Sequence, residues 1–117
     1  MEHSNPVIYF NPKCSKCRMT LKLIQDQGKH PETVEYLREP PARTELQRIL
    51  NLLGMTAEQL LRKKEPAYRE SGLNESSDEE EILDAMMKFP ILIERPIVIH
   101  NGRAAIGRPP EMVLEIL

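Results

Sequence analysis

Val7-Ile8-Tyr9-Phe10-Asn11-Pro12-Lys13-Cys14-Ser15-Lys16-Cys17 is the stretch that decides the fold of this chain. Its apolar residues 7–10 predict a short strand, and a helix is predicted to begin just after Cys14. Unsatisfied backbone N–H groups and the positive end of the helix dipole stabilise an anion at that position. The cationic side chains of Lys13, Lys16 and Arg18 are expected to add to this effect. We therefore predict a lowered pKa for Cys14 and chemistry at its sulfur.

Other uses of the two cysteines are less well supported by the sequence. A zinc site needs about four ligands, and the histidines, which are His3, His30 and His100, offer no second ligand pair with useful spacing. A structural disulfide across three positions would constrain the unfolded chain very little. An inert, buried thiol remains an open alternative for Cys17, which lies on the predicted apolar face of the helix. No metal site is predicted.

Length and composition limit the other classes of function. The chain has 117 residues, which suits a single domain over 1–117 with one core. Its formal net charge of -2 gives no electrostatic footprint for nucleic acid. No apolar run is long enough to span a membrane, and the first residues lack the pattern of a signal peptide. These features predict a cytoplasmic protein, where a Cys-x-x-Cys motif is more often catalytic than structural.

The remaining elements predict an α/β fold. A helix over 15–27 and a strand over 33–37 complete a parallel βαβ unit. A helical segment of about 41–89 follows, with capping signals at Thr56 with Gln59 and at Ser77 with Glu80.

The end of the chain predicts strands at 97–99 and 104–106, joined by a tight turn at Asn101-Gly102, and a terminal helix. The buried stripe of that helix is predicted to be Met112, Val113 and Ile116. This order is typical of a thioredoxin-like fold (βαβ then ββα) with a helical insertion between its halves.

Three arginines stand at the predicted ends of elements, where functional sites are commonly built. They are Arg62, Arg95 and Arg108. A guanidinium group is a forked donor suited to an oxyanion. Spacing alone does not distinguish these arginines from solvated surface residues.

Five motifs in order along the chain resemble the glutaredoxin-coupled arsenate reductase (ArsC) family. They are Tyr9 to Arg18, Tyr36-Leu37-Arg38-Glu39-Pro40-Pro41, Leu61-Arg62-Lys63-Lys64-Glu65, Glu94-Arg95-Pro96-Ile97-Val98 and Ile106-Gly107-Arg108-Pro109-Pro110. The resemblance covers nearly the whole chain. It implies that Cys14 is the nucleophile, with Asn11 nearby in the same motif. It also implies that Arg62, Arg95 and Arg108 bind the oxyanion, and that Pro96 is the family's cis-proline beside the site.

The resemblance also implies a reaction. Arsenate would bind to the arginines and be attacked by the Cys14 thiolate, glutathione would serve as co-substrate, and glutaredoxin would regenerate Cys14. No bound cofactor is expected, and a monomer is expected.

Two positions depart from the family's usual pattern. Phe10 stands where well-studied members carry a histidine that helps to lower the cysteine pKa. Cys17 stands where the reductases often carry serine, and a second thiol there is similar to the Spx-type regulators, which bind RNA polymerase and use a Cys-x-x-Cys disulfide as a redox switch. Three alternatives for the chain follow: an arsenate reductase, a redox-switched interaction protein, and a thiol oxidoreductase of another substrate. For Cys17, a resolving role that could admit thioredoxin as reductant stands beside an inert one.

Overall fold

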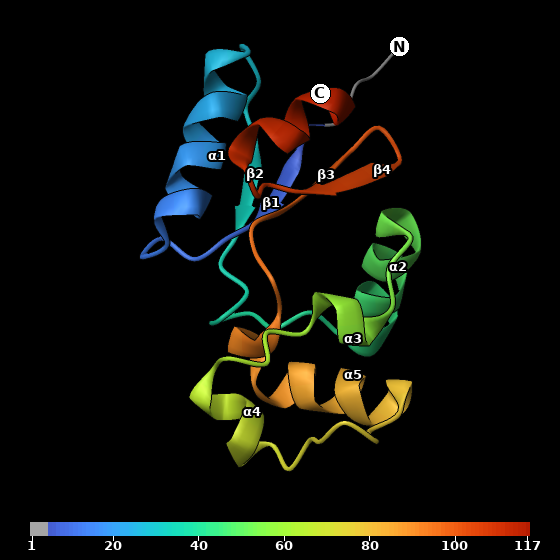
Figure 1. Ribbon diagram of the computed structural model, residues 1–117. Coiled ribbons are helices and arrows are strands. Elements are labelled where there is room, and N and C mark those ends of the chain that lie inside the picture. Colours follow the sequence, from blue (N-terminus) through green and yellow to red (C-terminus); the bar gives the residue numbers. More distant parts are fainter. Residues whose placement is uncertain (1–4) are drawn as a thin grey trace. The chain divides into compact units, whose positions relative to one another are not determined.

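The computed structural model describes residues 5–117, which form two compact units (Figure 1). The first, here called the thiol unit, comprises the described residues up to Glu39 together with Arg95–Leu117. The second, here called the helical unit, is Pro40–Glu94 and contains the segment 41–89 that the sequence indicated as an insertion. That the whole chain behaves as one domain stays a prediction.

A four-stranded mixed sheet forms the base of the thiol unit, with the strand order β2-β1-β3-β4. β1 (Val7–Tyr9) runs parallel to β2 (Glu32–Val34) and antiparallel to β3 (Ile97–His100). β3 in turn pairs antiparallel with β4 (Arg103–Ile106). α1 (Ser15–Asp26) connects the two parallel strands, as the βαβ prediction requires. The thioredoxin-like topology predicted from the sequence is therefore present.

Local sequence signals explain how this sheet is closed. The hairpin between β3 and β4 turns at Asn101 and Gly102, whose φ values are 55° and 73°. Two consecutive positive φ values suit the tight turn that the Asn-Gly pair predicted. The second strand is shorter than the predicted 33–37, because the chain turns back on itself where Arg38 and Glu39 both donate to the carbonyl of Glu35.

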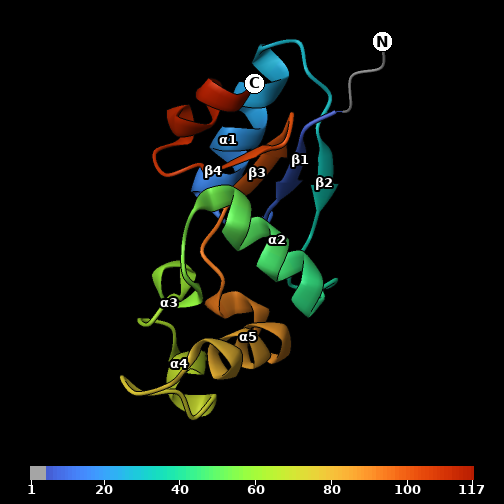
Figure 2. The ribbon, with the colours of Figure 1, turned by 90° about the vertical axis from the view of Figure 1, so that its right-hand side faces the viewer.

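The C-terminal segment corrects a prediction. It forms a 3-10 helix, η2 (Pro110–Ile116), instead of an α-helix. A 3-10 helix has three residues per turn, so Pro110, Val113 and Ile116 share the buried face. Met112, which was expected in the buried stripe, is turned outward and is 47% exposed. α1 and η2 pack against each other beside the sheet (Figures 1 and 2).

The helical unit contains four short helices and one further 3-10 turn. These are α2 (Arg43–Leu53), α3 (Ala57–Leu60), α4 (Pro66–Glu70), α5 (Glu79–Lys88) and η1 (Pro90–Leu92). The capping box of Thr56 with Gln59 is confirmed. The prediction for Ser77 with Glu80 was wrong by one residue, because Asp78 and Glu81 form the box and Ser77 instead accepts a hydrogen bond from the backbone N–H of Asn74. Across residues 5–117, no helix combines the length and the apolar character needed to cross a membrane.

Candidate active site at Cys14

Cys14 is the N-cap residue of α1, with φ −94° and ψ 123°. The loop that presents it is held by its own hydrogen bonds. The backbone N–H of Cys14 donates to the Asn11 carbonyl at 2.9 Å, and the N–H of Lys13 donates to the Asn11 side-chain oxygen at 3.0 Å. Arg18 closes the loop from the helix, because its Nη1 donates to the Pro12 carbonyl at 2.9 Å. The polar residues between strand and helix therefore fix the place of the thiol.

The pKa of Cys14 is lowered from its ordinary value of 9.0. Partial burial alone would raise it, because burial disfavours the charged form. Stabilisation of the thiolate outweighs this effect. It comes from the backbone N–H and the thiol of Cys17, the positive charge of Arg95 and the backbone N–H of Lys16. Cys14 is therefore suited to nucleophilic chemistry.

These causes differ in part from the predicted ones. The lowered pKa was predicted, and so was a role for the helix N-terminus. The side chains of Lys13, Lys16 and Arg18 were also expected to contribute, but the main cationic contribution comes from Arg95. The Arg18 guanidinium is directed to the Pro12 carbonyl. The prediction relied on cations that are close in the sequence, whereas the sheet brings the distant Arg95 close to the Cys14 thiol.

Two of the sequence-indicated arginines lie with Cys14 in the thiol unit. The Nη2 of Arg108 donates to the Cys14 sulfur at 3.8 Å, and its Nε donates to the Arg95 carbonyl at 2.7 Å. The peptide bond between Arg95 and Pro96 is cis, as the resemblance implied. The structure thus brings Cys14, Asn11, Arg95, Pro96 and Arg108 into one site.

Gly107 lies where α1 packs closely against the loop of Pro96. The sequence did not identify it as a site residue. Its N–H donates to the Pro96 carbonyl at 2.9 Å. A Cβ atom at this position would lie 2.5 Å from Oγ1 of Thr20 and 2.9 Å from Cγ of Pro96. Thr20 is fully buried, and its hydroxyl donates to the Lys16 carbonyl in α1. Only glycine lets α1 and the Pro96 loop approach so closely.

Arg62 belongs to the helical unit and has its own set of partners. Its Nη2 lies 2.8 Å from a carboxylate oxygen of Glu65, and its Nε lies 3.6 Å from one of Glu94. Its Nη1 donates to the Ile91 carbonyl at 3.3 Å. The pair with Glu65 could have been suspected from the spacing of three residues, whereas Glu94 is distant in the sequence. That Arg62 acts with Arg95 and Arg108 on one oxyanion stays a prediction.

Phe10 and Cys17 belong to the same buried core cluster as Cys14. Phe10 is 8% exposed and offers no polar group to the thiol. Cys17 is fully buried, and burial raises its pKa to about 12, with further upward contributions from the hydrogen bond and the charge of Cys14. The two cysteines therefore have opposite characters.

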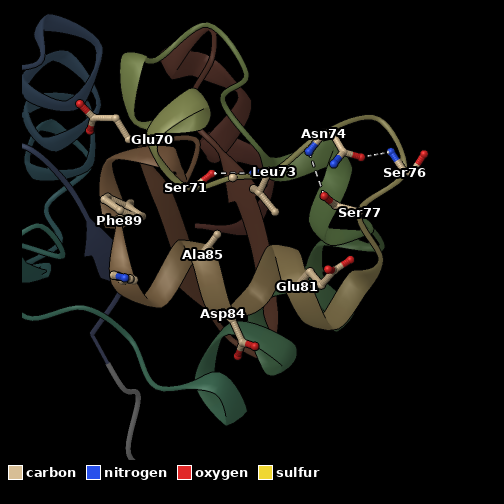
Figure 3. A pocket seen from close by; sticks show the side chains of 12 residues that line it. Glu70, Ser71, Leu73, Asn74, Ser76, Ser77, Glu81, Asp84, Ala85 and Phe89 are labelled. Atoms are coloured by element: carbon tan, nitrogen blue, oxygen red, sulfur yellow. Dashed lines mark hydrogen bonds between the residues drawn. The ribbon is translucent and has the colours of Figure 1, made fainter.

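Other features of the described residues do not suggest a second centre. No group of three or more histidine, cysteine or acidic side chains within residues 5–117 is arranged to hold a metal ion. The helical unit has a hollow of about 520 Å³, which is lined by residues between Glu70 and Phe89 (Figure 3). Its lining includes polar and acidic side chains such as Asn74, Glu81 and Asp84 but neither a cysteine nor an arginine. The reactive groups lie elsewhere.

Comparisons with known proteins identify the family of the chain and several relatives. Residues 9–116 match the model of the ArsC family. A protein of Escherichia coli strain K12, named as the uncharacterized protein YfgD, is 51% identical over 112 residues that cover 94% of both chains. The arsenate reductase of Rhizobium meliloti is 44% identical, over 94% of this chain and 79% of that protein. A solved structure of an arsenate reductase from Vibrio cholerae superposes with a TM-score of 0.93 at 45% identity, covering 99% of this chain and all of that one.

Proposed function

Because this chain belongs to the ArsC family, we propose that it is an arsenate reductase which reduces arsenate to arsenite through a covalent adduct on Cys14. The observation that carries the proposal is the lowered pKa of Cys14 together with the Arg108 guanidinium at its sulfur. A thiolate beside cationic donors is what attack on a tetrahedral oxyanion requires.

The first step is binding and attack. The guanidinium groups of Arg95 and Arg108, joined by Arg62, would bind the oxygens of arsenate. The Cys14 sulfur then forms a bond to arsenic, and one arsenate oxygen leaves as water after protonation. Backbone N–H groups at the start of α1 offset negative charge close to the reacting sulfur.

The second step is reduction. Glutathione attacks the adduct, the Cys14–arsenic bond breaks, and its electron pair stays on arsenic, which becomes trivalent. The two thiols have then supplied two electrons and are joined as a mixed disulfide between Cys14 and glutathione. A thiol of glutaredoxin takes over the glutathione and releases Cys14 as thiolate. We place this cycle in the cytoplasm, with no bound cofactor and with the protein as a monomer.

A second candidate is favoured by one observation, the pair of thiols at Cys14 and Cys17. In this alternative the chain is a redox-switched interaction protein similar to the Spx-type regulators. The arsenate reductase assignment is preferred because Arg95 and Arg108 both lie at the Cys14 site.

The test is a coupled assay that measures arsenite formation from arsenate with glutathione and glutaredoxin. We expect turnover by the wild-type protein and none by Cys14→Ser, with Ser15→Ala as the matched control for a change at the neighbouring position, the first residue of α1. A wild-type protein whose Cys14 reacts readily with alkylating reagents but which forms no arsenite would refute the assignment.

A further inference from the structure

The second thiol of the motif lies beside the first, in the same buried cluster. Cys17 is the third residue of α1, and the backbone N–H of Asn11 contacts its sulfur at 3.4 Å. This contact places the Cys17 sulfur under the same loop that carries Cys14. The side chains of the two cysteines are also joined by a hydrogen bond. The two sulfurs therefore face each other.

We propose that Cys17 is a resolving thiol, which displaces glutathione from Cys14 and leaves an intramolecular Cys14–Cys17 disulfide. Its place in the cycle rests on the proposed function, since it supplies a second route from the glutathione adduct back to free Cys14. The Cys17 sulfur attacks the Cys14 sulfur, the bond from Cys14 to glutathione breaks, and glutathione leaves with the proton of Cys17. A dithiol protein of the thioredoxin class then reduces the bridge and becomes a disulfide itself.

Access to solvent supports this assignment. Cys14 is 9% exposed, whereas Cys17 is fully buried among the core side chains of the thiol unit. Both thiols are buried, and Cys14 is the more accessible of the two. Cys14 is therefore the thiol that Cys17 can meet, and a bridge between them is the oxidised form that the packing favours.

The charge on Cys14 affects the pKa of Cys17. While Cys14 is a thiolate, its charge and its hydrogen bond keep the pKa of Cys17 high, in addition to the larger effect of burial. Once the Cys14 sulfur is bonded to glutathione it carries no charge, and both contributions disappear. The pKa of Cys17 then falls toward the value set by burial and by the N–H of Asn11. An adduct on Cys14 thus removes two of the contributions that keep Cys17 protonated, while burial, the largest one, remains.

A disulfide between Cys14 and Cys17 requires a small local movement. Side chains three apart on a helix have Cβ atoms about 5–6 Å apart, and a disulfide brings them to about 3.5–4.5 Å. Cys14 is the N-cap and has extended backbone angles; its carbonyl accepts the first helical hydrogen bond, from the Arg18 N–H at 3.0 Å, whereas its own N–H donates to the Asn11 carbonyl in the loop. The adjustment can therefore occur at the start of the helix without unwinding it.

The competing account is that Cys17 only donates a hydrogen bond to the Cys14 thiolate. Cys17→Ser separates the two roles, because a serine hydroxyl keeps a donor and cannot form a disulfide. Cys17→Ala removes both. Comparing the two variants distinguishes a positioning effect on Cys14 from the loss of a resolving thiol.

The experiment treats the reduced full-length protein with glutathione disulfide, quenches it with acid and determines intact masses over time. We expect wild-type protein to pass through a glutathione adduct to the intramolecular bridge. Cys17→Ser should stop at the adduct on Cys14, and Cys14→Ser should take up no glutathione. Thermal unfolding of each variant checks that it is folded. With glutathione as co-substrate and thioredoxin in place of glutaredoxin, Cys17→Ser should lose turnover that the wild type shows.

Two results would overturn the inference. One is a wild-type protein that accumulates the adduct as persistently as Cys17→Ser, with no bridge. The other is measurable turnover that is equal in wild-type protein and Cys17→Ser when glutathione is present and thioredoxin replaces glutaredoxin. A bridge that forms in a protein without arsenate turnover would support the resolving role and refute the proposed function, so the two failures are distinguishable.

Discussion

In the thiol unit, the surroundings of Cys14 stabilise the negative charge on its sulfur that the proposed chemistry needs. In the helical unit, the surroundings of Arg62 neutralise the positive charge of its guanidinium group. The Cys14 thiolate is stabilised by fixed backbone N–H groups and by the cation of Arg95. The Arg62 guanidinium is paired with the carboxylates of Glu65 and Glu94, and the three side chains are 20 to 33% exposed. The pKa of Cys14 is thus lowered in the free protein, while an oxyanion that bound at Arg62, as proposed, would have to compete with the two carboxylates.

This contrast predicts that the largest single effect comes from disturbing the packing that prepares Cys14. Gly107→Ala places a methyl group against Thr20 and Pro96, and we expect a loss of about 1–3 kcal/mol in the free energy of unfolding. Urea unfolding measures it. The double variant Gly107→Ala with Thr20→Ala removes one of the two clashes and should recover part of the loss. No loss in Gly107→Ala would contradict the close packing.

The pH dependence of stability sharpens the contrast between the two thiols. The pKa of Cys17 is raised from 9.0 to about 12 in the folded protein. The folded state then holds a proton that the unfolded state releases, so the contribution of Cys17 to stability is complete below pH 9.0 and is lost as the pH rises through about 12. Unfolding free energies measured in wild type and Cys17→Ser should therefore diverge in their pH slopes across this range. Parallel slopes would show that Cys17 is not a buried, protonated thiol.

Cys14 has the opposite sign, because its pKa is lowered from 9.0. Its contribution to stability is present above pH 9.0 and is lost as the pH falls through its lowered pKa. Cys14→Ser should accordingly lack a loss of stability on acidification that the wild type shows.

Arg95 offers a test of the cation that supports the thiolate. Arg95→Ala removes a positive charge, so the pKa of Cys14 should rise and alkylation at neutral pH should slow. Arg95→Lys keeps the charge and should lie between the alanine variant and the wild type. Alkylation quenched at successive times, followed by peptide mapping, measures the rate at Cys14. An alanine variant that reacts as fast as wild type would remove Arg95 from the account.

The smallest expected effect concerns Arg62. Replacing Glu65 or Glu94 by glutamine removes a carboxylate that competes with an anion, and we expect sulfate or arsenate to bind about two- to fivefold more tightly, as suits a partly exposed ion pair. Isothermal titration measures the change. Glu45→Gln is the matched control, because Glu45 pairs with Arg48 at the same spacing of three residues on α2. Weaker binding in the Glu65 and Glu94 variants would show that the carboxylates orient Arg62 instead of competing for it.

The sequence predicted the parts of the molecule that depend on local signals. The capping box at Thr56, the Asn-Gly turn and the place of Cys14 at the start of a helix all follow from a few adjacent residues. The choice between Ser77 and Asp78 as a cap failed because both types of side chain cap helices, and only the surrounding loop decides.

What the sequence did not predict depends on contacts between distant residues. Arg95 replaces the nearby lysines as the cation of Cys14 because β3 lies beside β1 in the sheet. Gly107 matters only because Thr20 and Pro96 approach it. The pairing of Arg62 with Glu94 likewise joins segments that are separate in the sequence. Met112 was misplaced because a 3-10 helix and an α-helix have different periods.

The most direct test of the central claim, that the fold lowers the pKa of Cys14, is the pH dependence of its alkylation. The rate at Cys14 is followed by peptide mapping in the folded protein and in the same protein unfolded in urea, which serves as the internal reference. The account predicts a lower midpoint for Cys14 in the folded protein than in the unfolded one, with Cys17 unreactive until the protein unfolds. A folded midpoint equal to or above the unfolded one would contradict it.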